Sequence, residues 1–457
     1  MLLRHQNPAK VIYKAVQFLL AVITVAASIR AGTPNIVKEG ADTLVNKNTH
    51  IPTDLLGKKW SYVTVRPGVH MFWWYYPCRN SFKTKSQQIP LVIWLQGGPG
   101  EAASGMGNFL EIGPYDMHWR TRNTTWANKV HLLFIDSPVG TGFSYADNLS
   151  LYARDEHQIA TDLFSVLRDF YSAVPDMHQL PLYIFGQSYG GKMAVSFASL
   201  LTQAIADTRI QCNLTGIGLF DPLISPIDTV TSYIDYYKAF SLMDDNEAKL
   251  AHEYVYKITQ LINKQQFDQA STTLIQLLTY IVDATGLVDV YNVLRHVDHN
   301  PFTPSHRINN SSEEVLLSQL MNGPIRNALG NIPQNLTWYP GNGQVYQILG
   351  NDIMQSVTDK IDGLLSDNIT VAVFTGQFDG LTNTIGTQAW IDKLKWSDLY
   401  QYQQIDKVPI YDQDNIIAFT KNYKQFSYHW ILNAGHYAIR DAPDTTFTLF
   451  QKVIGVL

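Results

Sequence analysis

Charged residues are scarce in this chain. Of its 457 residues 16% are charged, the formal net charge is −5, and 46% are hydrophobic. No run of basic residues occurs, so the sequence offers no electrostatic basis for binding nucleic acid. The apolar content is high enough to bury a large core, which argues against a disordered chain. The length is typical of an α/β enzyme in which a compact sheet domain carries a large insertion.

Long apolar segments are also rare. One covers residues 15–27, where it follows basic residues and precedes small residues around Ala31. This run is shorter than the roughly 20 residues that a membrane-spanning helix needs, and its surroundings are typical of a secretory signal peptide. We therefore expect a signal peptide at residues 1–31 and no stable membrane insertion, with an uncleaved signal anchor as the alternative.

The chain has only two cysteines, Cys78 and Cys212. In an oxidising compartment two cysteines can pair, and two buried free thiols are the alternative. Sequons for N-glycosylation favour the secretory pathway, so we expect a secreted or lysosomal protein. The acceptor residues are Asn123, Asn148, Asn213, Asn309, Asn310, Asn335 and Asn368.

Strands and helices alternate in the first part of the chain. Aromatic and β-branched residues alternate around Arg66-Pro67-Gly68, which predicts a β-hairpin over residues 60–76. Continuous apolar runs at residues 90–95 and 130–135 are typical of strands that are covered on both faces. Together these patterns predict a mostly parallel sheet with helices on both faces. The further expected elements are a helix at 155–174, a strand at 182–186, a helix towards Ala206 and a strand at 215–220.

The pattern changes after Asp221-Pro222. Residues 228–329 read as mainly helical, and the alternation of strand and helix returns only at residue 369. We therefore predict a sheet core in two parts, residues 32–221 and 356–457, which are separated by a helical insertion or cap at residues 222–355. An independent second domain is the alternative. The late elements are strands at 369–374 and 426–432 and helices at 384–394 and 444–456.

Between an expected strand and an expected helix stands Gly186-Gln187-Ser188-Tyr189-Gly190. This is the Gly-x-Ser-x-Gly pattern of a nucleophile elbow, in which the serine has a strained backbone and its neighbours must be small. Any Gly-Ser turn between a strand and a helix could produce the same letters. The remaining catalytic groups therefore decide the matter.

A serine nucleophile needs a base, and the base needs a carboxylate that orients it. In the α/β-hydrolase fold these groups follow in the order serine, acid and histidine, each after a strand. Asp379 follows a late expected strand and His436 follows the last one, which predicts an α/β-hydrolase fold with the triad Ser188, Asp379 and His436. Asp221 is the rival acid one strand earlier, and His429 lies within the last strand, where we expect a structural role.

The oxyanion of an acyl-transfer reaction needs two backbone N–H donors. The amide of Tyr189 follows the serine and is the first, and a glycine of the loop Gln96-Gly97-Gly98-Pro99-Gly100 is expected to supply the second. That loop follows an expected strand, and so does the loop of residues 136–145. Open α/β sheets bind their ligands at the carboxyl ends of their strands.

From about residue 60 to the C-terminus the chain resembles the serine carboxypeptidase family. Within the family it is most similar to the retinoid-inducible branch. The segments that carry this similarity are residues 71–76, 94–96 and 319–326, together with the positions of both cysteines. The motifs that carry the family resemblance are Trp94-Leu95-Gln96-Gly97-Gly98-Pro99-Gly100, residues 136–145, the elbow, Gly376-Gln377-Phe378-Asp379 and Ala434-Gly435-His436.

The resemblance implies a secreted or lysosomal exopeptidase that acts on the C-termini of peptides without a metal or organic cofactor. It makes Ser188 the nucleophile, His436 the general base and acid, and Asp379 the orienting carboxylate. Gly98 and Tyr189 become the oxyanion donors. The residues that would hold the C-terminal carboxylate of the substrate are Gln96, Gly97, Glu111 and Gln187.

The chain departs from the family pattern beside the serine. The family usually has a glutamate where this chain has Gln187, and that glutamate shares a proton with the residue that matches Glu111. We expect carboxypeptidase activity to persist, with its acid dependence set by Glu111 alone. Glu101 and Tyr437 also differ from the pattern. An esterase or acyltransferase on the same triad and a catalytically weak secreted binding protein are the alternatives.

Overall fold

A single twisted sheet forms the core of the computed structural model, which describes residues 59–80, 88–302 and 312–456. The predicted signal peptide and the sequons at Asn309 and Asn310 lie outside these residues. The strand order is β1-β2-β4-β3-β6-β7-β8-β11-β10-β9, and β5 pairs with β2. The strands are β1 (Lys59–Arg66), β2 (Val69–Tyr76), β3 (Leu91–Leu95), β4 (His131–Ile135), β5 (Tyr145–Ala146), β6 (Pro181–Gln187), β7 (Asn213–Phe220), β8 (Thr370–Gly376), β9 (Val408–Asp412), β10 (Asn415–Tyr423) and β11 (Phe426–Ile431).

The centre of the sheet is parallel, as the sequence predicts. Strands β4, β3, β6, β7, β8 and β11 run in one direction. Antiparallel strands extend both edges, with the predicted hairpin β1–β2 at one edge and β10–β9 at the other. The hairpin β9–β10 was not predicted from the sequence.

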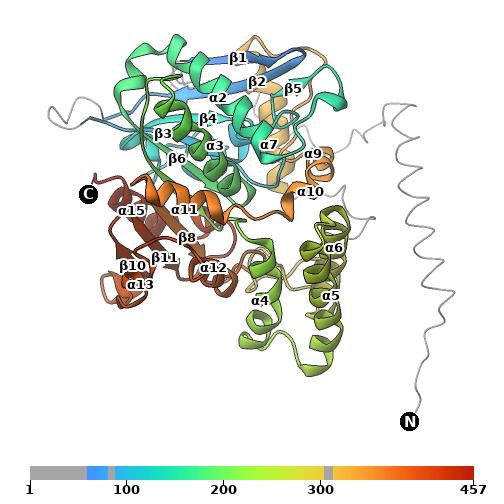
Figure 1. Cartoon of the computed structure of the whole chain (residues 1–457). Helices are drawn as coiled ribbons and strands as arrows, with labels where there is room; N and C mark the ends of the chain where they lie inside the picture. The colour runs from blue at the N-terminus through green and yellow to red at the C-terminus, as the bar shows by residue number, and fades with distance from the viewer. Residues whose placement is uncertain (1–58, 81–87, 303–311, 457) are drawn as a thin grey trace, which may run out of the picture. The chain divides into compact units, whose positions relative to one another are not determined.

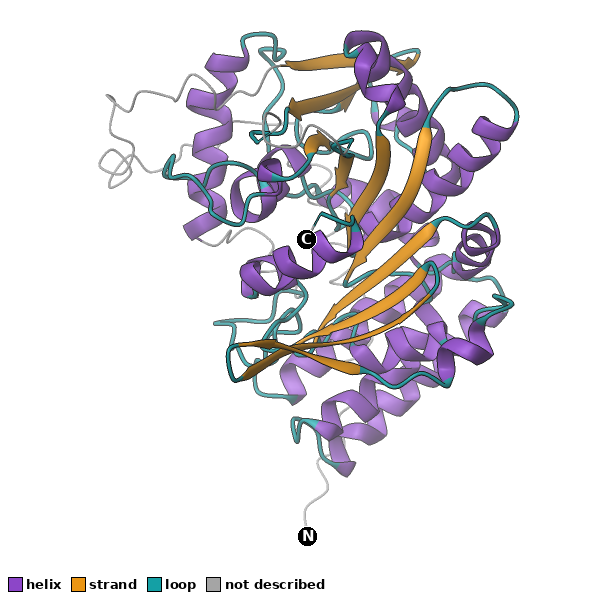
Figure 2. Ribbon diagram, turned by 90° about the vertical axis from the view of Figure 1, so that its left-hand side faces the viewer, coloured by secondary structure: helices purple, strands orange, loops and turns teal. Residues whose placement is uncertain are grey.

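Helices cover both faces of the sheet (Figure 2). Alternate residues of β2 therefore enter two separate apolar clusters, Met71 and Trp73 on one face and Phe72 and Trp74 on the other. This double burial explains the continuous apolar runs of the central strands. The first face carries α2 (Glu156–Ala173), α3 (Tyr189–Ala206), α11 (Thr358–Ser366) and α12 (Thr384–Ile391), and the second carries the π-helix η2 (Ala103–Ile112), α14 (Ala438–Asp441) and α15 (Pro443–Val453).

The chain leaves the sheet after β7 and returns to it at β8, and mostly helices lie between these strands. Helices α5 and α6 lie side by side (Figure 1). The domain boundaries at residues 222 and 355 stay a prediction. Besides α11, the described helices of this stretch are α4 (Pro226–Ala239), α5 (Asp245–Asn263), α6 (Phe267–Ala284), α7 (Ser312–Leu320), η7 (Met321–Ile325), α8 (Arg326–Leu329), α9 (Gly343–Ile348) and α10 (Gly350–Ile353). Short helices elsewhere are η3 (Trp126–Asn128), η4 (Leu149–Leu151), η5 (Pro175–Gln179) and α13 (Leu399–Gln403).

The two cysteines are not paired in the structure. Cys78 is buried and Cys212 is half-buried, and both are free thiols. The Cys78 amide donates to His131 Nδ1 at 3.3 Å, whereas the Cys212 sulfur lies 3.4 Å from the Tyr171 hydroxyl. Of the two alternatives, a disulfide or two free thiols, the structure therefore has two free thiols.

The sequons that the structure describes all lie at the surface. The side chains of Asn123, Asn148, Asn213, Asn335 and Asn368 are exposed, which glycosylation requires. Within the same described residues, every helix is too short or too polar to cross a lipid bilayer.

Candidate active site

Ser188 lies at the turn between β6 and α3, in a backbone conformation that residues with a side chain rarely adopt. Its φ is 56° and its ψ is −123°. The neighbouring glycines are needed for close packing: a Cβ atom on Gly186 would lie 2.1 Å from the Gly190 carbonyl oxygen, and one on Gly190 would lie 2.2 Å from the Leu95 oxygen. The local structure is thus the nucleophile elbow that the sequence pattern predicts.

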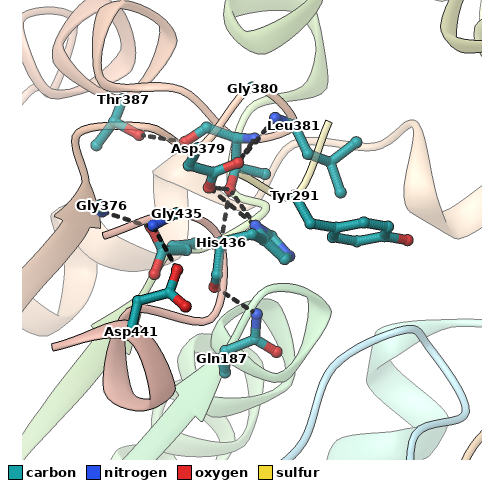
Figure 3. A network of polar contacts seen from close by, with 12 residues as sticks. Gln187, Tyr291, Gly376, Asp379, Gly380, Leu381, Thr387, Gly435, His436 and Asp441 are labelled. Atoms are coloured by element: carbon teal, nitrogen blue, oxygen red, sulfur yellow. Dashed lines mark hydrogen bonds and ion pairs between the residues drawn. The ribbon is translucent and has the colours of Figure 1, made fainter. Parts of the chain in front are cut away.

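Asp379 and His436 come together from the ends of β8 and β11. His436 Nδ1 lies 2.8 Å from Asp379 Oδ2, and both side chains are buried (Figure 3). The amides of Leu381 and Thr382 donate to Asp379 Oδ1 at 2.7 and 2.9 Å, so the carboxylate is held in one orientation. Burial acts to lower the pKa of His436, but the charge and hydrogen bond of Asp379 outweigh it and raise that pKa.

The elbow and the histidine loop are joined directly. Gln187 Nε2 donates to the main-chain oxygen of His436 at 3.0 Å. The oxyanion loop also packs on the elbow, because a Cβ atom on Gly97 would lie 2.7 Å from the Ser188 Cβ. Gly98 has a φ of 104°, which favours glycine at that position. The structure therefore brings the expected oxyanion loop, nucleophile and base into one place.

Tyr189, whose amide is the first of the two expected oxyanion donors, is the first residue of α3 and is fully buried. Its hydroxyl donates to Asp352 Oδ2 at 2.7 Å, and Lys192 Nζ lies 3.0 Å from the same oxygen. This buried network ties the start of α3 to α10. The side chain of Tyr189 is thereby fixed while its amide stays at the N-terminus of the helix.

The amide groups of the expected carboxylate subsite have defined orientations. Gln96 Oε1 accepts a hydrogen bond of 2.7 Å from the Trp94 indole, so its Nε2 is the atom that donates to Glu111 Oε1 at 3.1 Å. Gln187 Nε2 is likewise bound to a carbonyl oxygen. Among the described residues no partner contacts Gln187 Oε1 or Glu111 Oε2, although both atoms are buried. The free atoms of both side chains are therefore oxygens.

Glu111 is the titratable group of this subsite. Burial raises its pKa to about 7, against the lowering effects of Arg440 and of the hydrogen bond from Gln96. Near neutral pH the side chain therefore passes between a neutral acid, which can donate a hydrogen bond, and a carboxylate, which can only accept.

A cavity of about 360 Å³ adjoins His436. Tyr291 and Tyr437 form part of its wall, and their ring centroids lie 5.5 and 5.6 Å from that of His436. Arg440 and Glu313 form an ion pair on the same wall. The cavity thus combines charge of both signs with the aromatic surface of two residues whose rings lie near that of His436.

The two departures from the family pattern contact each other. The Tyr437 hydroxyl donates to Glu101 Oε1 at 2.9 Å, and burial raises the pKa of Glu101. This bond links the loop after His436 to the loop that carries the oxyanion glycines. The contact between the two residues therefore gives one oxygen of the Glu101 carboxyl group a hydrogen-bond donor.

A segment of the insertion that sequence reasoning missed supports both triad loops. The Val290 oxygen accepts from the Gly380 amide at 2.9 Å, and the Tyr291 oxygen accepts from the His436 amide at 2.6 Å. Asp441 accepts from the Gly435 amide and from Asn292 Nδ2, at 2.8 and 2.9 Å (Figure 3). No local pattern marks these residues, because their partners lie 90 or more positions away in the sequence.

The rival residues have other environments. Asp221 is buried beside Asp379, and it is Asp379 that contacts the His436 ring. His429 lies in β11, where its Nδ1 is 2.9 Å from the Thr420 hydroxyl. Burial lowers the pKa of His429 to about 3, so this side chain is neutral and takes part in packing.

Comparison with known proteins agrees with this geometry. A human protein named retinoid-inducible serine carboxypeptidase is 37% identical over 418 residues, which cover 88% of this chain and 92% of the relative. The Arabidopsis thaliana protein named serine carboxypeptidase-like 51 is 33% identical, with 86% and 91% covered.

The fold is shared with a solved structure. The crystal structure of Kex1(delta)p, a prohormone-processing carboxypeptidase from Saccharomyces cerevisiae, superposes with a TM-score of 0.75 at 21% identity, covering 87% of this chain and 90% of the other. The likeness shows an α/β-hydrolase fold. The model of the serine carboxypeptidase family matches residues 52–455. This chain therefore belongs to the serine carboxypeptidase family.

Proposed function

We propose that this chain removes C-terminal residues from peptides by an acyl-enzyme mechanism in which Ser188 is the nucleophile. The observation that carries the proposal is the buried hydrogen bond of 2.8 Å between His436 and Asp379, in a loop that is bonded to the residue before Ser188. A histidine held in this way has the tautomer that a general base requires.

The reaction follows from the positions of these groups. His436 takes the proton of the Ser188 hydroxyl while the serine oxygen attacks the last peptide carbonyl. The amides of Gly98 and Tyr189 donate to the oxyanion that forms. His436 then gives the proton to the leaving amine, the C–N bond breaks, and the C-terminal residue departs. Water attacks the ester in the same way and restores Ser188.

The subsite for the substrate carboxylate works best with a neutral Glu111. Because the free atoms of Glu111 and Gln187 are oxygens, an ionised Glu111 would repel a carboxylate, whereas a protonated one can donate to it. Gln96 and the amide of Gly97 complete this subsite. Binding of the substrate carboxylate is therefore expected to be strongest in acid and to weaken above the pKa of Glu111, which is about 7, whereas the base function of His436 requires its neutral form.

The test is the release of C-terminal amino acids from N-blocked dipeptides between pH 4 and 8. We expect release by the wild type and none by Ser188→Ala. A serine-directed phosphonate, which needs no carboxylate subsite, is used in parallel. Release that survives in Ser188→Ala would overturn the proposal.

An esterase or acyltransferase activity is the second candidate. It is favoured by the unpartnered oxygen of Gln187, since a subsite of acceptors suits a substrate with a hydroxyl or amide donor. An enzyme of this kind reacts with the phosphonate and cleaves esters but releases no amino acid from dipeptides. A catalytically weak binding protein would do neither.

We further propose that the protein enters the secretory pathway and is secreted or lysosomal. The exposed sequon asparagines in the described residues support this, as do the sequence features of the N-terminus. Treatment of the protein from secreting cells with a peptide N-glycanase is expected to lower its apparent mass. An unchanged mass would contradict this proposal.

A further inference from the structure

Asp221 is a buried carboxyl group that the reaction described above does not use. It directly follows β7, and its side chain has no exposed surface. Its φ is 43°, a left-handed conformation that is unusual for a residue other than glycine. Strained backbone of this kind persists where neighbouring contacts determine it, often at functional sites.

These contacts place Asp221 against the loop of the triad acid. Its amide donates to the Phe374 oxygen at 2.7 Å, and its Oδ1 accepts from the Gly376 amide at 2.7 Å. The Thr382 hydroxyl lies 2.9 Å from the Asp221 main-chain oxygen and 2.6 Å from Asp379 Oδ2. The Asp221 carboxyl group is thus fixed by β8, and the Asp221 main chain shares Thr382 with the Asp379 carboxyl group.

One oxygen of Asp221 is left over. Within the described residues, Asp221 Oδ2 is buried and receives no hydrogen bond from a donor group. The carboxyl group of Asp379 is its neighbour: it interacts with the Asp221 side chain by charge and by a hydrogen bond, and Thr382 bridges the two residues. Two carboxylates cannot both be ionised in such contact, so a proton must lie between them. That proton satisfies the unpartnered oxygen.

The surroundings decide which of the two acids carries the proton. Asp379 accepts from the amides of Leu381 and Thr382 and is bound to His436, so the hydrogen-bond donors around the pair are directed at Asp379. Burial, and next the charge of Asp379, raise the pKa of Asp221 well above its usual range. The amide of Ala438 on α14 also faces Asp221, as do the phenols of Tyr236 on α4 and Tyr428 on β11, whose own pKa values burial raises.

We propose that Asp221 is a neutral carboxylic acid that donates a hydrogen bond to Asp379 and thereby positions the acid of the triad. The inference rests on the proposed function for its catalytic consequence, but the protonated pair itself does not depend on activity. Asp221 contacts neither substrate nor reacting atoms and is a positioning residue. A donor at this place keeps Asp379 oriented towards His436 and disperses part of its charge.

Conservative and disruptive variants separate this role from simple packing. Asp221→Asn keeps an oxygen for the Gly376 amide and an N–H donor for Asp379, whereas Asp221→Leu keeps neither. We expect Asp221→Leu to lose about 10- to 100-fold in the rate of labelling of Ser188 by the phosphonate, as befits one lost hydrogen bond to a charged group. Asp221→Asn is expected to restore most of that loss.

The pH dependence of labelling gives a second readout that a packing defect would not move. Without its donor, Asp379 is a stronger base towards His436, so the pKa of His436 rises further. The increase of the labelling rate with pH should therefore shift to higher pH in Asp221→Leu and stay near the wild-type position in Asp221→Asn. Equal profiles in all three proteins would contradict the positioning role.

The proton itself can be seen by infrared difference spectroscopy on the inactive Ser188→Ala protein. We expect a carbonyl band of a neutral carboxylic acid that persists to pH 9 and disappears when Asp221→Asn is added. Asp441→Asn is the matched control, because Asp441 is paired with Arg295 and should contribute no such band. A spectrum in which Asp221→Asn removes only a carboxylate band would overturn the proposal. If the acid band is present but the wild type neither releases amino acids nor reacts with the phosphonate, the proposed function is rejected. The protonated pair of Asp221 and Asp379 would then still stand.

Discussion

The side chain of Gln187 donates a hydrogen bond of 3.0 Å to the main-chain oxygen of His436. The residue before Ser188 thus holds the loop that carries His436, and an amide performs this task without a change of charge. A glutamate at the same place could donate only in its protonated form. The relationship explains how the chain keeps the loop in place at a pH where a glutamate would be ionised.

Gln187→Glu should therefore move activity towards acid. Ionisation of the new glutamate would lose the bond to His436 and would add a second negative charge to the subsite of Glu111. We expect kcat/KM for blocked dipeptides to fall at lower pH than in the wild type. Gln187→Met is the control, since it removes the bond without adding charge. A profile of Gln187→Glu that coincides with the wild type would refute this account.

Glu111→Gln tests the titration of the carboxylate subsite. Glu111 is neutral below its pKa of about 7 and is ionised above it, so binding of a substrate carboxylate should weaken as pH rises through 7. We expect the KM of the wild type for dipeptides to increase over this interval. In Glu111→Gln the KM should depend far less on pH, because the amide has no proton to lose. Phosphonate labelling should not show this difference.

The same shift bears on stability. Because the folded state holds the proton of Glu111 more tightly than the unfolded state, stability is expected to fall as pH rises from about 4.5, the ordinary value, to beyond 7. Urea unfolding of the wild type and of Glu111→Gln at pH 5 and 8 measures this effect. The variant should lose less stability between the two pH values, and an equal or larger loss would contradict the assignment.

Asp441→Asn probes the support of the histidine loop. An amide at this position can still accept from Gly435 and Asn292, which both donate to Asp441 Oδ2, but it loses the ion pair of Oδ1 with Arg295 and the negative charge that strengthens these bonds. We expect kcat to fall by about 10-fold, as for one hydrogen bond to a charged group, with KM little changed. Asp444→Asn, at an exposed position of α15, is the matched control and should leave kcat unaltered. A rise of KM alone would show that Asp441 acts on substrate binding instead.

Local patterns were sufficient to predict the central sheet and the elbow. Strands buried on both faces must be apolar throughout, and the steric demands of the turn at Ser188 require small neighbours, so both leave a signal within a few residues. The order of Asp379 and His436 after late strands likewise follows from the geometry of the fold. The structure places them 2.8 Å apart.

What the sequence did not predict depends on contacts between distant segments or on exposed elements. The support from Tyr291 and Asn292 reaches His436 and Asp441 across more than 140 residues, and no spacing within either segment records it. Strand β9 is largely exposed, so it lacks the apolar run by which the central strands were recognised. The sequence also could not predict whether Cys78 and Cys212 pair, since a disulfide depends on the distance between the two residues in the fold.

The buried ion pair behind the oxyanion residue should be important for stability. Lys192 Nζ lies 3.0 Å from Asp352 Oδ2, both side chains are buried, and Lys192 also donates to the Gln355 oxygen at 2.8 Å. Lys192→Met would leave the Asp352 charge in the interior with only neutral donors, at a cost of about 3–5 kcal/mol in the free energy of unfolding.

Urea unfolding with a matched surface pair decides whether burial causes this loss. Lys238 pairs with Asp245 at the surface, where the two side chains are 44% and 87% exposed, so Lys238→Met should leave the free energy of unfolding nearly unchanged. Adding Asp352→Asn to Lys192→Met removes the uncompensated charge and should recover part of the lost stability. If the double variant is no more stable than Lys192→Met, the loss comes from packing around α3, and the unpaired charge of Asp352 is not its cause.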